Sequence, residues 1–403
     1  MELFLQMGHG MMEHCYHLIQ HWGTGTVIVS PKNLTLEQIL KFSKKISKNN
    51  GSILIDPQFY IPRTSQENLH NHSFWPNTFD TTTFFNGDGI DKLIDIFLNE
   101  YILPSDSSGI IIPSLYLEDI NEDWCNINEL IINSLNRYQL VSPKYLTLCI
   151  GEEIIKSEEK IHMLIEQVED YPVDGFYIIP VHPNNEYLID NMTWLINLID
   201  LVAGLKLLDK RIILGYANHQ FLSFAVAKID AICAGIWLKT RMFPLGDFVA
   251  DDEDSSFGGR RTTWYYCPQA LSEYQIPFLD VAHRVGIIDQ LATADSFQSG
   301  YPTPLFSGAQ PSTVAFNETK AFRHYLQCLK TQCDEINKDS YDETKRYLRL
   351  LFETASDLSD YFRSNGVRGK YREFTNVADS TLALIDAFDA MRGLVFNTNW
   401  DEL

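Results

Sequence analysis

Residues capable of chemistry follow a series of short apolar segments in the first part of the chain. The densest group lies in residues 51–60 (GSILIDPQFY), where an apolar run ends in Asp56 and is followed by Gln58 and Tyr60. A carboxylate in this position can act as a general base or nucleophile or bind the amide edge of a ligand, although an Asp can also cap a turn. We therefore predict that Asp56 is catalytic and that Gln58 and Tyr60 bind substrate.

Other polar residues occupy equivalent positions after neighbouring apolar segments. Glu152 is the second catalytic candidate, because it could pair with Asp56 across one site. The remaining substrate-binding candidates are His9, His182, Asn218, His219, Lys239 and Arg241. We expect the two basic residues among them, Lys239 and Arg241, to contact phosphate.

Eight apolar segments place these residues along the chain. They are Leu3–Met7, Thr26–Ser30, Ser52–Gln58, Gly109–Pro113, Thr147–Gly151, Gly175–Pro180, Arg211–Tyr216 and Ala231–Gly235. Most are rich in Ile, Val, Leu or Phe and precede a stretch with helical periodicity, which is typical of repeated βα units. Eight such units predict a (β/α)8 TIM barrel, an α/β fold whose active sites lie at the carboxyl ends of the strands.

The helical stretches extend beyond the barrel. Periodicity predicts helices at Met11–Trp22, Thr35–Lys48, Asp91–Glu100, Asp123–Tyr138, Ser157–Glu169, Thr193–Leu208 and Gln220–Lys228. Residues 316–365 are expected to form two further helices, and Asn376–Gly393 another. We accordingly assign residues 1–260 to the barrel and residues 261–403 to a mainly helical C-terminal extension packed on it.

Two long connections and two local clusters have alternative interpretations. The connection Tyr60–Asn86 could form one wall of the site. The connection Thr240–Tyr266 contains an acidic run and the pair Arg260-Arg261, and is either a solvated loop or a lid that offers these arginines to an anion. Residues 262–268 (TTWYYCP) either stack on a base or pack between the barrel and the C-terminal helices. The basic cluster at residues 363–372 is either a surface turn or a phosphate-binding loop.

The overall composition limits the partners and the compartment. The 403-residue chain has a net charge of −21, so taken whole it repels nucleic acid, although a local basic patch is compatible with this charge. Seven scattered cysteines indicate reduced thiols in a cytoplasmic protein and not a disulfide framework. No apolar stretch reaches the ~18 residues needed to span a membrane, and the first residues lack a signal-peptide pattern.

Three blocks together resemble a known family. They are the segment that ends in Asp56, the segment Val173–Ile179 (VDGFYII), and the segment Arg211–Ala225 running on to Arg241. In this order and over residues 52–241, they resemble the tRNA-guanine transglycosylase superfamily. The resemblance implies a barrel enzyme that exchanges a purine or 7-deazapurine base at an N-glycosidic bond in nucleic acid, with a carboxylate acting at the sugar C1′.

Individual positions match that family unevenly. Asp56 matches the acid of its first motif, Gly215 matches the glycine of the seventh strand, and Thr240 with Arg241 matches the Thr-Arg pair after the eighth strand. The family's nucleophilic aspartate falls near Cys233, and the nearest carboxylate, Asp230, lies three residues earlier. The family's zinc cluster is also missing. The nearest substitutes are His324, Cys328 and Cys333, which lack an evident fourth ligand, so we predict neither a metal nor another cofactor.

Three functions therefore remain open from the sequence. The first is base exchange on a nucleic acid or nucleoside. The second is a non-catalytic, transglycosylase-like subunit that binds protein partners in a larger prokaryotic assembly, by analogy one of antiviral defence. The third is an unrelated barrel hydrolase that uses Asp56 and Glu152, because barrels host many chemistries.

Overall fold

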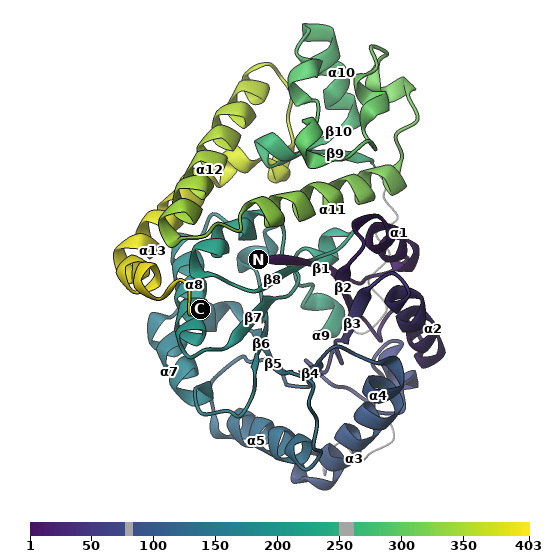
Figure 1. Ribbon diagram of the computed structural model, residues 1–403, viewed down its shortest axis with the longest axis vertical. Helices are drawn as coiled ribbons and strands as arrows, with labels where there is room; N and C mark the ends of the chain where they lie inside the picture. Colours follow the sequence, from purple (N-terminus) through teal and green to yellow (C-terminus); the bar gives the residue numbers. More distant parts are fainter. Residues whose placement is uncertain (77–83, 250–261) are drawn as a thin grey trace.

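A computed structural model describes residues 1–76, 84–249 and 262–403 of the chain. Eight parallel strands form a nearly closed barrel surrounded by helices (Figure 1). The strands are β1 (Glu2–Gln6), β2 (Gly25–Val29), β3 (Gly51–Ile55), β4 (Ile110–Ile112), β5 (Lys144–Ile150), β6 (Gly175–Pro180), β7 (Arg211–Leu214) and β8 (Ala231–Ala234). Each overlaps one of the eight predicted apolar segments, so the predicted (β/α)8 barrel is confirmed.

The strand order fixes where the strand ends meet. The order around the sheet is β3-β2-β1-β8-β7-β6-β5-β4, and every neighbouring pair is parallel. β3 and β4 stand at the two ends of this order. The Ser108 N–H, just before β4, donates a hydrogen bond to the Ile53 carbonyl of β3 at 3.0 Å, which brings the two strands close together. All carboxyl ends therefore share one rim, which we call the barrel mouth.

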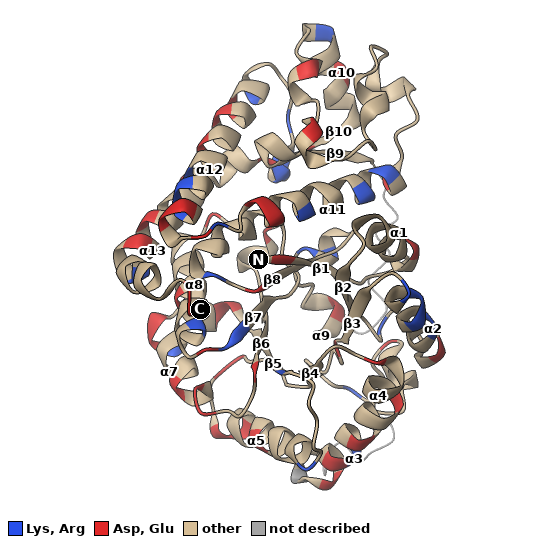
Figure 2. Ribbon diagram, viewed as in Figure 1, with Lys and Arg blue, Asp and Glu red and all other residues tan. Residues whose placement is uncertain are grey.

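Helices between the strands form the outer layer. They are α1 (Met12–Trp22), α2 (Leu36–Ser47), α3 (Asp88–Ile96) with its π-helical continuation η4 (Phe97–Ile102) and α4 (Leu103–Ser105), α5 (Glu122–Asn136), α6 (Glu152–Ile155), α7 (Glu158–Val168) and α8 (Met192–Leu207). A capping box begins α2, since Thr35 and Gln38 exchange hydrogen bonds. Charged residues concentrate on these outer helices and leave the strands largely uncharged (Figure 2).

The helices that directly follow β7 and β8 are 3-10 helices or short helices. The predicted helix Gln220–Lys228 is a 3-10 helix, η6 (His219–Ala227), whose residues are all buried. β8 is followed by the short elements η7 (Leu238–Thr240) and α9 (Gly246–Val249). An almost wholly apolar segment such as η6 needs cover on every side, and elements from the end of the chain supply that cover.

Three C-terminal helices complete the layer. They are α11 (Glu318–Glu335), α12 (Tyr341–Ser364) and α13 (Ala378–Asn399), close to the three helices predicted there. α11 packs against β1 and η6, while α13 packs against η6 and α8. Buried residues of all three helices, such as Leu329, Phe352 and Phe388, belong to the same hydrophobic core as the barrel.

A small subdomain lies beyond α11, on the side away from the barrel (Figure 1). It contains the antiparallel hairpin β9 (Trp264–Cys267) and β10 (Ser272–Gln275), followed by α10 (Ile276–Val285). A separate hydrophobic cluster, which includes Tyr265, Leu279 and Phe362, holds it together. The hairpin was not predicted from the sequence, where residues 262–268 were expected either to stack on a base or to pack against the C-terminal helices.

Short 3-10 segments make up much of the remaining chain. They are η1 (Leu69–Asn71), η3 (Phe84–Asn86), η5 (Pro183–Asn185), η9 (Pro268–Ala270), η10 (Ile288–Leu291), η11 (Asp295–Phe297), η12 (Thr303–Phe306), η13 (Pro311–Thr313), η14 (Lys370–Arg372) and η15 (Phe374–Asn376). The acidic run and the arginine pair discussed as a lid, at residues 251–254 and 260–261, lie outside the described residues.

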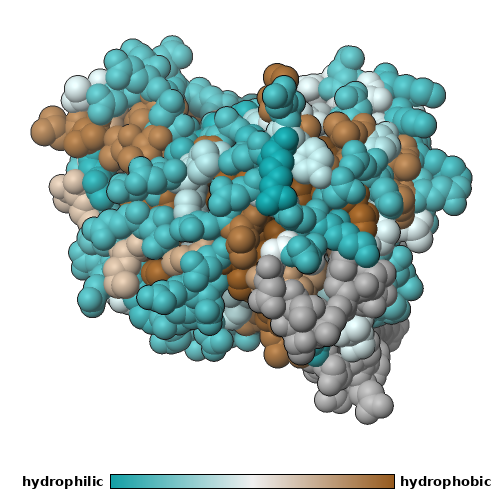
Figure 3. All heavy atoms as spheres, turned by 90° about the horizontal axis from the view of Figure 1, so that it is seen from below, coloured by the Kyte–Doolittle hydropathy of each residue, from teal (hydrophilic) through white to brown (hydrophobic). Residues whose placement is uncertain are grey.

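The surface carries both hydrophilic and hydrophobic side chains. Figure 3 shows one face on which hydrophobic patches interrupt a mostly hydrophilic covering. Among the helices in the described residues, none combines the length and the hydrophobicity that crossing a bilayer requires.

Candidate functional site

Asp56 lies at the centre of a polar cluster at the barrel mouth. The residue directly follows β3, and its side chain is fully buried. Oδ1 accepts a hydrogen bond from the Gln58 backbone N–H at 2.9 Å. Oδ2 accepts one from the Tyr60 hydroxyl at 2.5 Å and a longer one from the Tyr177 hydroxyl at 3.4 Å. The carboxylate is therefore held in one orientation by groups from β3, its following turn and β6.

Burial changes the acidity of this carboxyl group. Loss of hydration raises the pKa of Asp56 to about 6, and the hydrogen bonds from Tyr60, Gln58 and Tyr177 oppose the rise. A carboxyl group that titrates close to neutral pH can both donate and accept a proton during a reaction.

Two glutamines extend the cluster. The Gln58 Oε1 atom accepts from the Ser30 hydroxyl at 2.8 Å and the Lys32 backbone N–H at 3.0 Å, which leaves its Nε2 atom 3.3 Å from the Tyr216 hydroxyl. The Gln6 Oε1 atom accepts from the Tyr177 hydroxyl at 3.0 Å, while its Nε2 atom is buried without a hydrogen-bond partner among the described residues. A buried donor without a partner is unusual in a folded protein, and this one lies beside the Asp56 cluster.

Gly215 makes room for Tyr177 against β7. A Cβ atom on Gly215 would lie 2.7 Å from the Tyr177 ring, closer than side chains tolerate. A larger residue at position 215 would therefore displace the ring whose hydroxyl contacts Asp56 and Gln6. This packing gives a physical reason for the glycine that the family resemblance matched.

Aromatic rings cover the cluster on the side of the barrel mouth. Phe243 and Phe248, from the segment after β8, each lie edge-on to Tyr60 with ring centroids 5.1 Å apart. Phe243 also lies edge-on to Tyr216, with ring centroids 5.1 Å apart. Both phenylalanines are buried. These two rings therefore pack directly on the two tyrosines that surround Asp56 and Gln58.

Glu152 does not join this cluster. It begins α6, where its side chain pairs with Lys156 at 2.5 Å and accepts a weak hydrogen bond from the Asn184 backbone N–H at 3.4 Å. The hydrogen-bond partners of Asp56 are different residues, so the structure does not show the expected contact between the two carboxylates.

The two histidines predicted at the first and sixth strand ends differ in environment. His9 is exposed, and its backbone carbonyl accepts a hydrogen bond from the Trp237 indole at 2.9 Å. His182 is buried beside Trp194 and Phe221, and burial lowers its pKa to about 4. Among the described residues, neither ring forms a hydrogen bond or an aromatic contact with the Asp56 cluster.

The eighth strand offers a thiol in place of a carboxylate. Cys233 is fully buried, and burial together with the nearby Asp56 raises the pKa of its thiol, so it stays protonated and weakly nucleophilic. Asp230 precedes β8 at the opposite end of the barrel. There it accepts from the Ile212 N–H at 2.7 Å and pairs with Lys206 at 3.0 Å, which is a structural role.

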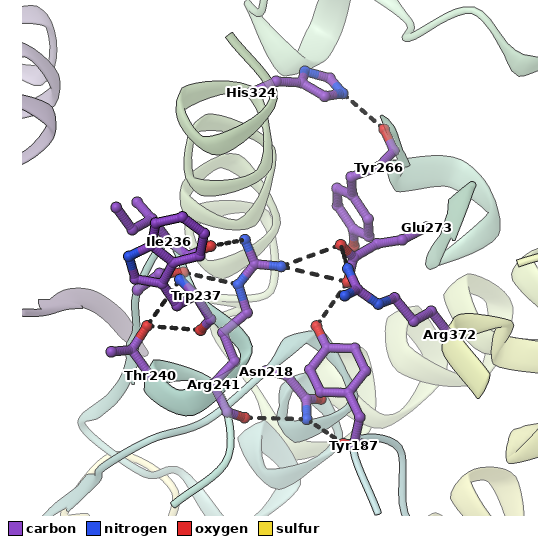
Figure 4. A network of polar contacts seen from close by, with 11 residues as sticks. Tyr187, Asn218, Ile236, Trp237, Thr240, Arg241, Tyr266, Glu273, His324 and Arg372 are labelled. Atoms are coloured by element: carbon purple, nitrogen blue, oxygen red, sulfur yellow. Dashed lines mark hydrogen bonds and ion pairs between the residues drawn. The ribbon is translucent and has the colours of Figure 1, made fainter. Parts of the chain in front are cut away.

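A second buried charge cluster lies where the barrel meets the hairpin. Arg241 and Arg372 approach the carboxylate of Glu273 from opposite sides (Figure 4). The Arg241 Nη1 atom lies 3.3 Å from both carboxylate oxygens, and the Arg372 Nη1 atom lies 2.9 Å from Oε2. The Tyr187 hydroxyl donates to Oε1 at 2.9 Å. We call these four residues the junction cluster.

The junction cluster keeps its carboxylate ionised. Burial alone would raise the pKa of Glu273, but Arg372 and Arg241 hold it down at about 2. Glu273 is therefore ionised at neutral pH, whereas Asp56 titrates close to it.

Three of the predicted binding residues belong to this junction and not to the Asp56 cluster. Asn218 donates to the Tyr187 carbonyl at 2.7 Å and caps η6 by accepting from the Gln220 N–H at 2.9 Å. The His219 ring packs against Tyr187 and Tyr266, has no hydrogen-bond partner on either nitrogen, and has its pKa lowered by burial to about 4. Arg241 is the third.

A cavity of about 630 Å³ lies beside the junction cluster. Its lining comes from the segment after β8, the hairpin, α11 and η14. The lining residues are Ile236, Trp237, Leu238, Lys239, Arg241, Thr262, Thr263, Trp264, Tyr266, Glu273, Glu318, Ala321, Phe322, Tyr325, Tyr371 and Arg372. Lys239, predicted to contact phosphate, lies at this cavity and pairs with Asp247 at 2.6 Å.

The cavity thus joins three features that the sequence analysis treated separately: the basic residues after β8, the aromatic block at 262–268 and the basic cluster at 363–372. Sequence reasoning missed Glu273, the residue that links them. The only signal for it was an acidic residue placed between apolar neighbours, in the segment ALSEY at residues 270–274.

The residues considered as zinc-ligand substitutes form a hydrogen-bonded core. The two ring nitrogens of His324 lie 2.7 Å from the Tyr266 carbonyl and 2.7 Å from the Ser299 hydroxyl, and the Cys328 sulfur lies 3.5 Å from Nδ1. Cys333 is buried further along α11. Within residues 1–76, 84–249 and 262–403, no group of three or more His, Cys, Asp or Glu side chains is arranged to hold a metal ion.

No protein-family model matches this chain, and no curated protein matches it in sequence. The barrel, the Asp56 cluster and the junction cluster are therefore the features that bear on function.

Proposed function

We propose that this protein is a transglycosylase-like enzyme that exchanges a purine or 7-deazapurine base at an N-glycosidic bond, with Asp56 as its reactive carboxyl group. One observation carries the proposal. A single carboxyl group with a pKa of about 6 is buried at the mouth of a (β/α)8 barrel, where enzymes of this fold place their chemistry.

This acidity suits a mechanism that needs one carboxyl group. As the bond between C1′ and the base nitrogen breaks, its electron pair leaves on the base, and protonated Asp56 transfers its proton to that nitrogen. The resulting Asp56 carboxylate stabilises the positive charge on the sugar. When the incoming base attacks C1′ with a nitrogen lone pair, Asp56 takes up the proton that this nitrogen loses, and the cycle closes.

The neighbouring groups have positioning roles in this mechanism. Tyr60 and Tyr177 orient the carboxyl group through their hydroxyls. The unpartnered Nε2 atom of Gln6 is a donor available to a base edge. Phe243 and Phe248 must swing aside for a base to bind, and the base would then take over their contacts with Tyr60.

The test is incorporation of radiolabelled guanine and of a labelled 7-deazaguanine into tRNA and into double-stranded DNA. We expect incorporation by the wild-type protein and a loss of at least about 100-fold in Asp56→Asn, as for removal of a general acid–base. Asp119→Asn is the matched control, because Asp119 is exposed and pairs only with Lys160. Absence of incorporation by the wild-type protein, alone and with its co-purifying partners, would refute the proposal.

A second candidate is a non-catalytic subunit of a larger assembly. Cys233 in the eighth strand favours it, because in the described residues this strand contributes a protonated thiol and not the second carboxylate of a double-displacement enzyme. In that case Asp56→Asn would leave the activity of the native assembly unchanged, while omission of the whole subunit would abolish it. For either candidate we propose a cytoplasmic location, because all seven cysteines are unpaired.

A further inference from the structure

The cavity beside the junction cluster has the size and the position of a ligand site. Its volume of about 630 Å³ falls within the range of small-molecule pockets, ~300–1,000 Å³. It lies between the segment after β8 and the elements β9, α11 and η14, so residues from both halves of the chain build it. None of its lining residues contacts Asp56 through a hydrogen bond described above.

Charge favours an anion in this cavity. Three basic side chains line it against two acidic ones, in a protein whose net charge is −21. The Glu273 carboxylate is already occupied by Tyr187, Arg241 and Arg372. Lys239 pairs with Asp247, so the local positive charge comes from the junction cluster, where two guanidinium groups share the single Glu273 carboxylate.

One buried donor among these cations has no partner. The Nε atom of Arg372 is buried and makes no hydrogen bond to any of the described residues. Arg372 as a residue is only 9% exposed. Because buried donors are nearly always satisfied, this guanidinium is suited to a bound anion, and its planar shape matches a phosphate.

Aromatic side chains form the rest of the cavity wall. Trp264 packs under the Arg372 guanidinium at 3.9 Å, and Tyr371 lies beside Trp264 with ring centroids 6.2 Å apart. Trp237, from the segment after β8, and Phe322, from α11, form an edge-on pair with ring centroids 4.8 Å apart. Tyr371 is 54% exposed, so much of its ring is available for stacking on a planar ligand.

We propose that this cavity binds a nucleoside monophosphate, with its base against the aromatic residues and its phosphate on Arg372. The proposal is independent of base exchange at Asp56, because the two clusters share no residue. A nucleoside monophosphate would contact both the basic and the aromatic residues that line the cavity.

The first test is calorimetric titration of the purified full-length protein with GMP, guanosine and inorganic phosphate. We expect GMP to bind at least about tenfold more tightly than guanosine, because a charge-assisted hydrogen bond contributes ~1.5–3 kcal/mol. Equal affinity for guanosine would contradict the phosphate contact, and binding of phosphate as tight as that of GMP would contradict the stacking. Failure of GMP to bind at millimolar concentration would overturn the site.

The second test uses matched variants. Tyr371→Ser should weaken GMP binding at least about fivefold, in line with the loss of one stacking partner. Tyr361→Ser is its control, because Tyr361 is 39% exposed on α12 and does not line the cavity. Arg372→Gln should weaken GMP more than guanosine, and a circular dichroism spectrum checks that this variant folds.

Asp56→Asn separates the two proposals. It should abolish base exchange and leave the affinity for GMP unchanged. A parallel loss of GMP affinity would place the nucleotide in the barrel mouth and refute the cavity as its site. If Tyr371→Ser and Arg372→Gln bind GMP as the wild type does, the cavity is likewise refuted, whatever the exchange assay shows.

Discussion

The barrel mouth and the junction cluster both bury a carboxyl group completely, yet they change its acidity in opposite directions. Asp56 is surrounded by hydroxyl and amide donors, and its pKa rises to about 6. Glu273 stands between two guanidinium groups, and its pKa falls to about 2. Equal burial therefore gives a titrating group where the neighbours are neutral and a fixed charge where they are cationic.

This difference separates two kinds of role. A group that gains and loses a proton near neutral pH is suited to proton transfer, which is why the proposed reaction is assigned to Asp56. A group that stays charged and fully hydrogen-bonded holds its neighbours in place. Glu273 accordingly fixes the two arginines that border the cavity and connects the barrel to the hairpin.

The largest expected effect on stability comes from removal of the Glu273 carboxylate from the junction cluster. Glu273→Gln leaves two buried guanidinium groups facing each other without a counter-charge, and should lower the free energy of unfolding by about 3–5 kcal/mol. Urea denaturation at pH 7 measures it. Glu353→Gln, at an exposed ion pair with Arg349, should change stability by less than about 0.5 kcal/mol. A loss in Glu273→Gln as small as that would mean that the junction cluster is not a structural unit.

Acid should destabilise the junction through His219. The pKa of His219 is lowered to about 4 in the folded protein, so the folded state binds fewer protons than the unfolded chain between pH 6.5 and 4. Stability is therefore lost as the pH falls through this range, by up to about 1.4 kcal/mol per pH unit for this residue. The slope of unfolding free energy against pH should be shallower in His219→Gln and unchanged in His21→Gln, an exposed residue at the end of α1. Equal slopes in all three proteins would show that His219 is not buried uncharged.

The barrel mouth should respond to pH with the opposite sign. Because the pKa of Asp56 is raised in the folded state, its contribution favours folding at low pH and is lost as the pH rises from about 4 to 6. Asp56→Asn removes this dependence, so its stability relative to wild type should increase by about 2 kcal/mol between pH 4 and pH 8. Chemical denaturation of both proteins at these two values measures the change, and a difference that stays constant would contradict the raised pKa.

The smallest expected effect is from crowding of the Asp56 cluster. Gly215→Ala brings a Cβ atom against the Tyr177 ring and should destabilise the fold by about 1–2 kcal/mol, as overpacking does in other cores. Gly300→Ala is the control, since a Cβ there would meet nothing within 4 Å. Thermal unfolding compares the two variants. Equal transition temperatures would mean that Tyr177 is not fixed against β7.

The barrel could be predicted from the sequence because its signals are local. Each strand is a short apolar run, and each early helix has a periodic apolar face, as in α2 with its Thr35 capping box. The segment 220–228 was predicted as a regular helix and is a 3-10 helix instead, because its almost continuous apolar residues are buried by α11, α12 and α13. That cover depends on contacts far apart in the chain, which periodicity does not reveal.

The site could be predicted only in part. Asp56, Gln58 and Tyr60 follow one strand directly, and the turn after β3 brings them together. Glu152 also follows a strand, but α6 begins at this residue and Lys156 on the same helix pairs with it. Arg241 was expected to meet phosphate, and its partner Glu273 could not be foreseen because the hairpin that carries it was not predicted. The arrangement of both clusters depends on which side chains meet across the barrel, and a single sequence gives no direct signal for that.

The most direct measurement is a carbon-13 NMR titration of the side-chain carboxyl groups, with Asp56 and Glu273 assigned from Asp56→Asn and Glu273→Gln. We expect the Asp56 signal to titrate with a pKa of about 6 and the Glu273 signal to remain that of a carboxylate down to the pH at which the protein unfolds. If Asp56 instead titrates near 4, as an exposed aspartate does, the barrel mouth has no proton-transfer group near neutral pH and the proposed reaction loses its basis.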